Sequence, residues 1–436
     1  MWEKLIQIFK IKDLRNKIIF VLAMLIAFRL AANLPIPIID SFALERLLEG
    51  QLVGTGNNFL NLLSIVTGGA LNNLSIVMLG LGPYITATII MQLLTMIFPA
   101  LEAMYKEEGE AGRQKFNQYG RIITVPLAML QSYAMIHLMR SQLGAHGVLV
   151  NITGWQIILA MTTITAGTVF LMWIGELISE KGIGNGVSLL IFAGIVARFP
   201  FSVGRVLTEG TIKENLPQYI GFLVIALVII ISVVIITEGR RNIPVSYAKR
   251  VRGSRIYGGV STYLPLNVNP AGVIPIIFAI SILLFPSMVG NFLAGAKNQY
   301  VSSTAITLKN LFAQPGLIYN LMYFLLVVLF TYFYTAVTFD PKNVAENLQK
   351  MGGFIPGIRP GKPTTEFLNF ILNRVLLIGA VFLGLIAIAP FLIQLVTPQV
   401  TAFTIGGTSV LIVVAVVLET VRQIESQLVM REYEGF

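Results

Sequence analysis

The chain has 436 residues, of which 55% are hydrophobic and only 12% charged, and its formal net charge is +10. Soluble domains are about 25% charged, and a soluble core cannot bury this share of apolar surface. We therefore predict that most of the protein is surrounded by lipid. Cysteine is absent, which excludes disulfides, thiolate catalysis and cysteine metal sites.

Apolar runs long enough to cross a bilayer, about 20 residues each, recur along the whole chain. They predict ten membrane spans, at 18–36, 59–98 (interrupted), 122–139, 154–176, 186–200, 218–237, 271–289, 317–339, 367–395 and 404–421. An even number of spans places both termini on one side. The segments on that side hold 22 Lys and Arg, against 7 on the other, so the positive-inside rule predicts cytoplasmic termini.

Glycine and proline interrupt the second and the seventh predicted spans. The breaks are Gly68, Gly69, Gly80, Gly82 and Pro83 in one and Pro270, Gly272 and Pro275 in the other. Breaks in lipid need shelter from protein or a water-filled cavity, and broken helices at corresponding positions indicate a pathway between two inverted repeats. We therefore predict two halves, 1–200 and 201–436. The alternative is that glycine and proline are simply commoner in membrane helices.

Residues 57–74 precede the second break and are too few to span a bilayer. They predict a half-helix that enters the membrane from outside, either as a plug or as a surface re-entrant segment. The sequence GIGNG at 182–186 follows a predicted span rather than a strand, so it does not match a nucleotide-binding loop. We interpret it as a tight turn in which Asn185 caps the next helix.

Few ionisable side chains lie within the predicted spans. Arg29 and Arg374 are the deepest, and His137 lies at the end of a span. Ion- and proton-coupled transporters usually keep such groups near mid-membrane because they are expensive there and are retained for function. The scarcity disfavours a coupled transporter, and we expect no enzymatic activity, no cofactor and no metal site.

Two long predicted cytoplasmic loops, 238–270 and 340–366, are basic. Their candidate docking residues are Arg240, Arg241, Tyr247, Lys249, Arg250, Arg252, Arg255, Arg359 and Lys362. Lysine and arginine here serve topology and attract anionic lipid. Loop length beyond what topology requires favours an acidic or polyanionic partner, and charge alone does not identify it.

Several motifs of this chain resemble the bacterial SecY family along nearly its whole length. They are GGALNNLSI at 69–77, PYITATIIMQLL at 83–94, EGEAGRQKFNQYGR at 108–121, GIGNGVSLLIFAGIVA at 182–197, YAKR at 247–250, NPAGVIPIIFA at 269–279, PGIRPGKPT at 356–364 and GGTSVLIVV at 406–414. The resemblance implies an all-α integral membrane protein. Its ten transmembrane helices would form two inverted five-helix halves, which open like a clamshell around an hourglass pore.

The resemblance also implies residue roles. The apolar pore ring would be Leu81, Ile85, Val187, Ile191, Ile277 and Ile412, in which Leu81 and Val187 replace the isoleucine common in bacterial relatives. The plug, 57–74, would include Leu60, Leu62, Ile65, Gly68, Gly69 and Leu71, and the lateral gate would include Thr86, Gln131 and Ile274. An apolar ring can exclude ions by dewetting.

The implied function is that of a passive channel in the bacterial cytoplasmic membrane. It would pass unfolded secretory chains and release transmembrane segments into the lipid bilayer. Its partners would be SecE, SecG, the SecA motor, the ribosome, and a secretory precursor with its signal peptide. Two alternatives stay open: a small-solute secondary transporter, which also uses inverted repeats, and an accessory paralogue of the same fold.

Overall fold

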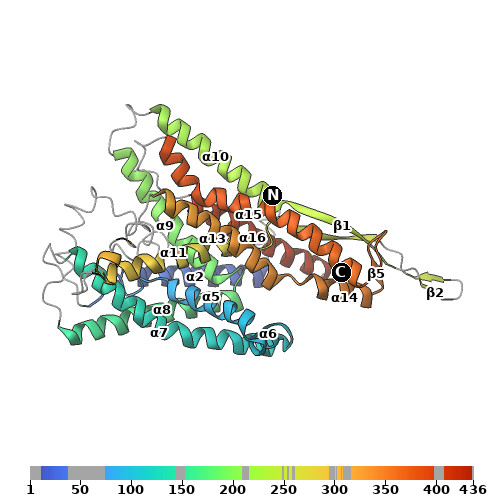
Figure 1. The fold of residues 1–436 in the computed structure, drawn as a ribbon, viewed down its shortest axis with the longest axis horizontal. Coiled ribbons are helices and arrows are strands. Elements are labelled where there is room, and N and C mark those ends of the chain that lie inside the picture. Colours follow the sequence, from blue (N-terminus) through green and yellow to red (C-terminus); the bar gives the residue numbers. More distant parts are fainter. Residues whose placement is uncertain are drawn as a thin grey trace. The chain divides into compact units, whose positions relative to one another are not determined.

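The computed structural model describes residues 11–37, 74–143, 153–208, 216–247, 250–252, 255–257, 261–293, 300, 302–305, 307, 316–396 and 407–434. Figure 1 shows a mostly helical protein. Its long helices are α2 (Lys12–Asn33), α5 (Gly82–Ile97), α7 (Gly109–Leu143), α8 (Gly154–Lys181), α9 (Gly186–Thr208), α10 (Leu216–Glu238), α11 (Ile274–Leu293), α13 (Leu317–Thr338), α15 (Lys362–Val396) and α16 (Gly407–Glu434). Each predicted span therefore overlaps one of these helices.

Contacts divide the chain into two compact units. The first contains Met1–Leu216, Ile280–Asn320 and Val416–Phe436, and the second contains Pro217–Ala279 and Leu321–Ala415. In the first unit, α7 packs against both α5 and α8, and α8 also contacts α2 and α9. Ile164, Leu171 and Ile174 of α8 are at most 1% exposed, so α8 contributes a large part of the core of this unit.

Residues 74–81, directly before α5, form turns rather than a helix, as Gly80 and Gly82 predict. Ile36 donates its amide to the carbonyl of Leu74 at 3.0 Å, and Ile76 donates to Leu34 at 2.9 Å. Amides of Met78, Gly80 and Gly82 then bond to the carbonyls three residues earlier. These five amides are thus paired within protein, as an apolar surrounding requires.

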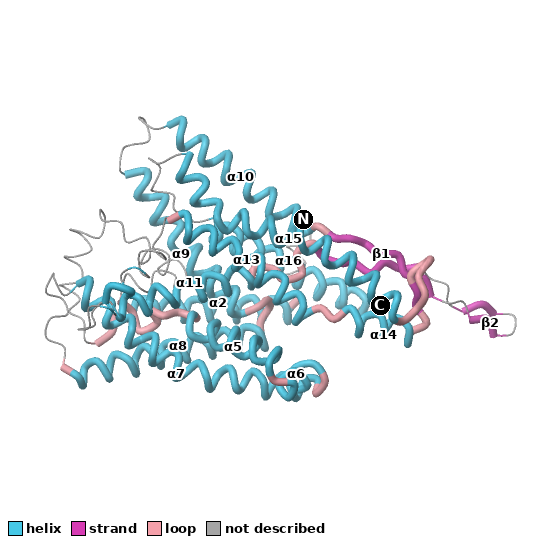
Figure 2. Tube along the Cα trace, viewed as in Figure 1, coloured by secondary structure: helices cyan, strands magenta, loops and turns pink. Residues whose placement is uncertain are grey.

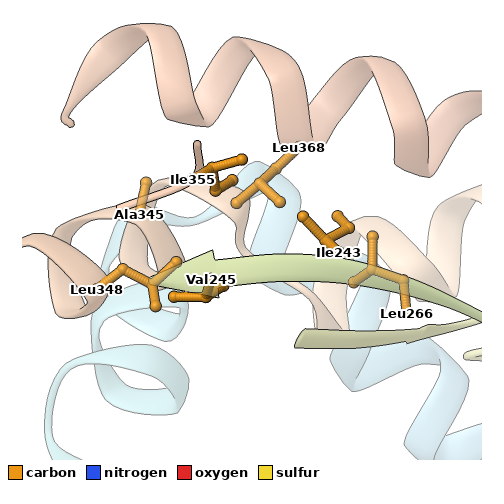
Figure 3. Packing of buried hydrophobic residues seen from close by; sticks show 7 residues of the cluster. All are labelled: Ile243, Val245, Leu266, Ala345, Leu348, Ile355 and Leu368. Atoms are coloured by element: carbon orange, nitrogen blue, oxygen red, sulfur yellow. The ribbon is translucent and has the colours of Figure 1, made fainter. Parts of the chain in front are cut away.

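The second unit contains a small sheet beside the short helix α14 (Pro341–Lys350). Its strands are β1 (Arg240–Tyr247), β4 (Ser261–Asn267) and β5 (Gly353–Phe354), antiparallel in the order β4-β1-β5, while β2 (Arg250–Arg252) pairs with β3 (Arg255–Tyr257). Figure 2 shows these strands in magenta. One face of the sheet packs on α14 and on the start of α15, with Ile243, Val245, Leu266, Ala345, Leu348, Ile355 and Leu368 as its core (Figure 3).

Two prolines shape the edges of this sheet. Pro244 lies opposite Tyr263, and Pro265 lies opposite Asn242. Since proline has no amide hydrogen to give to a ladder, and pair types alternate along antiparallel strands, we assign both pairs as non-hydrogen-bonded. The nitrogen of Pro265 therefore faces the open edge of β4.

The segments predicted as cytoplasmic connections between spans contain helices and strands of their own. Residues 99–121 form α6 (Pro99–Lys106) and the first part of α7, 238–270 contains four strands, and 340–366 contains α14 and β5. Helix α14 has local sequence signals of its own. Asp340 caps it by accepting from the amides of Lys342 and Asn343, and proline occupies its first turn.

Many large apolar side chains point outward from the long helices. Three helices in the described part of the chain are long and apolar enough to cross a membrane, at Gly154–Lys181, Leu317–Lys350 and Lys362–Ile393. A fourth candidate is the pair α5 and α6, which bend by 111° at Phe98. Apolar helix faces left open to the surroundings are expected for a protein whose solvent is lipid.

Candidate functional site

Leu81 and Ile85, two of the predicted ring residues, lie where the broken segment becomes α5. Leu81 is the N-cap residue, and the amide of Ile85 donates to its carbonyl at 2.9 Å. The two side chains are 5% and 6% exposed. Because residues four apart share a helix face, they form one apolar patch at the start of α5.

Val187 and Ile191 lie at the start of α9, directly after the predicted tight turn. The turn is confirmed, and so is the cap, since Ser188 donates its amide to the side-chain oxygen of Asn185 at 3.1 Å. A side chain at Gly186 would overlap the carbonyl of Gly175 in α8. This close approach, which only glycine permits, sets the distance between α8 and the patch on α9.

Ile277 and Ile412, also predicted for the ring, belong to the second unit. Ile277 is half-buried on α11, and Ile412 is 5% exposed on α16. The next residue, Phe278, packs edge-on against Phe330 and Tyr334 of α13, with ring centroids 5.9 and 6.1 Å apart. Aromatic pairs of this geometry are favourable beyond their buried area, so they hold this part of α11 against α13.

The predicted gate residues are two polar side chains and one isoleucine, and they lie on α5, α7 and α11. The hydroxyl of Thr86 donates to the carbonyl of Gly82 at 2.9 Å, while Gln131 is half-buried on α7 and Ile274 opens α11. Sequence reasoning missed one ion pair nearby: Arg121 of α7 bonds Glu176 of α8 at 2.7 Å. It joins the first half of α7 to the C-terminal part of α8.

The predicted docking residues that the structure describes are carried by the sheet and its flanking turns. Arg240 and Arg241 are exposed on β1, whereas Tyr247 packs against the core shown in Figure 3. Arg359 is exposed in a turn between Gly357 and Gly361, which have φ angles of +83° and +100°.

This turn is held firmly at both ends. Ile355 is buried in the core at 3% exposure, and Ile358 donates its amide to the carbonyl of Ile355 at 3.0 Å. On the other side, the hydroxyl of Thr364 donates to the carbonyl of Arg359 at 2.9 Å, and exposed Lys362 opens α15. The structure therefore presents these cations on a folded platform, which consists of the sheet, α14 and the start of α15.

Some predicted residues lie outside the described part of the chain. They are Lys249 and the plug residues Leu60, Leu62, Ile65, Gly68, Gly69 and Leu71. The backbones of Arg250 and Arg252 lie on β2, and that of Arg255 lies on β3. Among the residues that the structure does describe, no group of three or more His, Asp or Glu could hold a metal ion.

The chain is similar to known proteins both in sequence and in fold. The SecY family model matches residues 75–421. Protein translocase subunit SecY of Streptomyces galbus is 44% identical over 98% of both chains, and that of Thermotoga maritima is 43% identical over 100% of this chain and 98% of its own. A solved structure of a protein-conducting channel has a TM-score of 0.64 at 20% identity, over 93% of this chain and 91% of that one. The chain belongs to the SecY family.

Proposed function

We propose that this chain is the channel subunit of a protein translocase, which passes unfolded secretory polypeptides across the cytoplasmic membrane. Membership of the SecY family supports this, because the relatives carry the name protein translocase subunit SecY. The observation that carries the proposal is the pair of apolar patches on α5 and α9, each beginning directly after a glycine-containing non-helical segment.

The constriction of this channel would be formed by all six predicted ring residues. Branched apolar side chains exclude ions by dewetting, and they offer a passing polypeptide no strong hydrogen bonds that would retain it. The plug would be residues 57–74. A solved SecY structure with a TM-score of 0.61 comes from work on a plug domain that stabilises the closed state of that channel.

Transmembrane segments of substrates would leave sideways through a lateral gate that includes Thr86, Gln131 and Ile274. The two five-helix halves, 1–200 and 201–436, would part to open it. Both termini would be cytoplasmic, as the bias of lysine and arginine predicts.

The energy for transport would come from partners docked on the cytoplasmic platform, because the channel itself would be passive. SecE and SecG would complete the complex, and SecA or the ribosome would drive the substrate. The exposed guanidinium of Arg359 suits a carboxylate or phosphate of such a partner. A related structure, with a TM-score of 0.60, is Sec61 in a canine ribosome-channel complex.

Reconstitution tests the proposal. Proteoliposomes would hold the chain with a SecE-type partner, SecA and ATP, and the assay would measure protease protection of an unfolded precursor with a signal peptide. We expect protection that requires every component. Failure to protect the precursor by a correctly inserted, partner-bound chain would contradict the proposal and favour the accessory paralogue or the solute transporter.

The Arg359→Glu variant tests docking within the same assay. We expect it to abolish SecA-driven protection while the protein still inserts and binds its partner, because the variant reverses the charge of an exposed turn. Lys350→Glu, at the end of α14, is the matched control for a general change in charge. Normal transport by Arg359→Glu would remove this turn from the docking surface.

A further inference from the structure

The turn between α8 and α9 contacts helices from both ends of the sequence. Ile183 is 4% exposed and packs with Leu14 of α2 and Leu428 of α16, and these three residues form a separate apolar cluster within the first unit. A turn that only connected two neighbouring helices would need neither contact. The packing therefore suggests a second role for this turn.

A hydrogen bond joins the same turn to α16. The amide of Gly184 donates to the side-chain oxygen of Gln423 at 2.7 Å, across 239 positions of sequence. Gly184 has a φ of +90°, which side chains other than glycine rarely tolerate. The left-handed backbone of Gly184 thus allows its amide to reach Gln423 of α16.

Two more side chains accept from amides of this segment, and both are local. Gly186 donates to the hydroxyl of Ser179 at 2.9 Å, which in turn donates to the carbonyl of Gly175, and Ser188 donates to Asn185. The first amides of a helix have no partner within the helix. Of the three amides held by side chains here, Gly184 alone is held by a residue distant in sequence.

We propose that Gln423 is a positioning residue for the pore-facing patch of α9. The proposal rests on the function proposed above for Val187 and Ile191. Val187 is the second residue of α9, so any displacement of the turn reaches its side chain directly. Apolar packing is non-directional and tolerates small rotations, whereas a short hydrogen bond from a fixed amide does not.

The geometry of α16 extends this role. Ile412 and Gln423 are both in this continuous helix, eleven residues apart, which corresponds to about three turns and nearly the same face. One helix therefore carries a predicted ring residue and anchors the turn that leads into two others.

Three substitutions separate this role from ordinary packing. Gln423→Met keeps the length of the side chain and removes the acceptor, while Gln423→Glu keeps an acceptor for the amide of Gly184. Gln427→Met makes the same exchange one turn further along α16 and is the matched control. Amide hydrogen exchange over residues 183–188 reports directly on the anchor, in full-length protein within lipid.

We expect exchange in this segment to be about tenfold faster in Gln423→Met, as loss of one hydrogen bond to a half-buried amide implies. Gln423→Glu and Gln427→Met should resemble the unchanged protein. Equal exchange in Gln423→Met and the unchanged protein would overturn the anchor.

Conductance of the resting channel in planar bilayers tests the positioning. We expect a higher ion leak for Gln423→Met and restoration of the seal by Gln423→Glu. Faster exchange with an unchanged leak would overturn the positioning role. Failure of the unchanged protein to protect a precursor would instead count against the proposed function, and the exchange measurements would still decide whether Gln423 holds the turn.

Discussion

Helix α10 and strand β1 follow one another in the chain, separated by Gly239 alone. They nevertheless differ in how far they expose the same types of side chain. On α10, Ile231 and Ile235 are 49% and 63% exposed, whereas on β1 Ile243 and Val245 are 2% and 1% exposed. The side chains are alike, so the difference lies in the solvent. An isoleucine side chain can face outward into lipid, whereas in water it is stable only when it is buried in a core.

The strongest test of this comparison removes part of the water-exposed core. Ile243→Ala should destabilise the sheet and α14 by about 2–5 kcal/mol, because a buried branched side chain leaves a cavity. Ile235→Ala is the control, and we expect little change there because lipid fills the space. Limited proteolysis of the segment 240–270 measures the difference. Equal sensitivity of the two variants to protease would refute the contrast.

A charge on the lipid-facing helix tests the other side of the comparison. Leu227 is 58% exposed near the middle of α10, where water would tolerate aspartate. If lipid covers it, Leu227→Asp should raise the free energy of insertion by about 3–4 kcal/mol. A membrane-insertion assay of α10 measures this, with Leu227→Ser as the milder control. Unimpaired insertion of the aspartate variant would show that lipid does not cover this face.

How far sequence predicts structure differs between the same two regions. All the long helices follow from apolar runs, and Asn185 is identified as a cap by local pattern alone. The sheet was missed because Pro244 and Pro265 interrupt the strand pattern, and α14 was missed although Asp340 and Pro341 mark its start. The bond between Gln423 and Gly184 has no local signal at all, because it depends on tertiary packing.

A smaller effect is expected at the cap of α14. Asp340 accepts from the amides of Lys342 and Asn343 at 2.9 and 3.3 Å, so Asp340→Ala should destabilise this helix by about 1 kcal/mol. Asp340→Asn retains an acceptor and should lose only part of this. Hydrogen exchange of α14 would detect the change. Equal protection in the alanine variant and the unchanged protein would show that packing on α15 suffices.

The smallest expected effect concerns the boundary between lipid and water, which the tryptophans of the protein can locate. Trp155 and Trp173 of α8 are 72% and 55% exposed. Eighteen residues separate them, which is about five turns and 27 Å, so they share one helix face. This spacing approaches the hydrocarbon thickness of about 30 Å, and tryptophan prefers the membrane interface.

Single-tryptophan variants make this measurement simple, because the chain has three tryptophans in all. With Trp2 and one of the pair replaced by phenylalanine, we expect lipids labelled near the headgroup to quench each remaining tryptophan more strongly than lipids labelled at the chain ends. Stronger quenching by the lipids labelled at the chain ends would place the tryptophan inside the hydrocarbon layer and not at its border. Absence of quenching by either lipid would mean that protein covers this face.

The outward-facing nitrogen of Pro265 affects whether an unfolded polypeptide can add to the edge of the sheet. An unfolded chain in transit is rich in unpaired amides and carbonyls, and an open strand edge is the surface on which it would add itself as one more strand. At Pro265 the edge of β4 lacks a donor, so a passing segment meets an interrupted ladder. In the function proposed above, this interruption would keep the sheet from adding a segment of the transported polypeptide as a further strand.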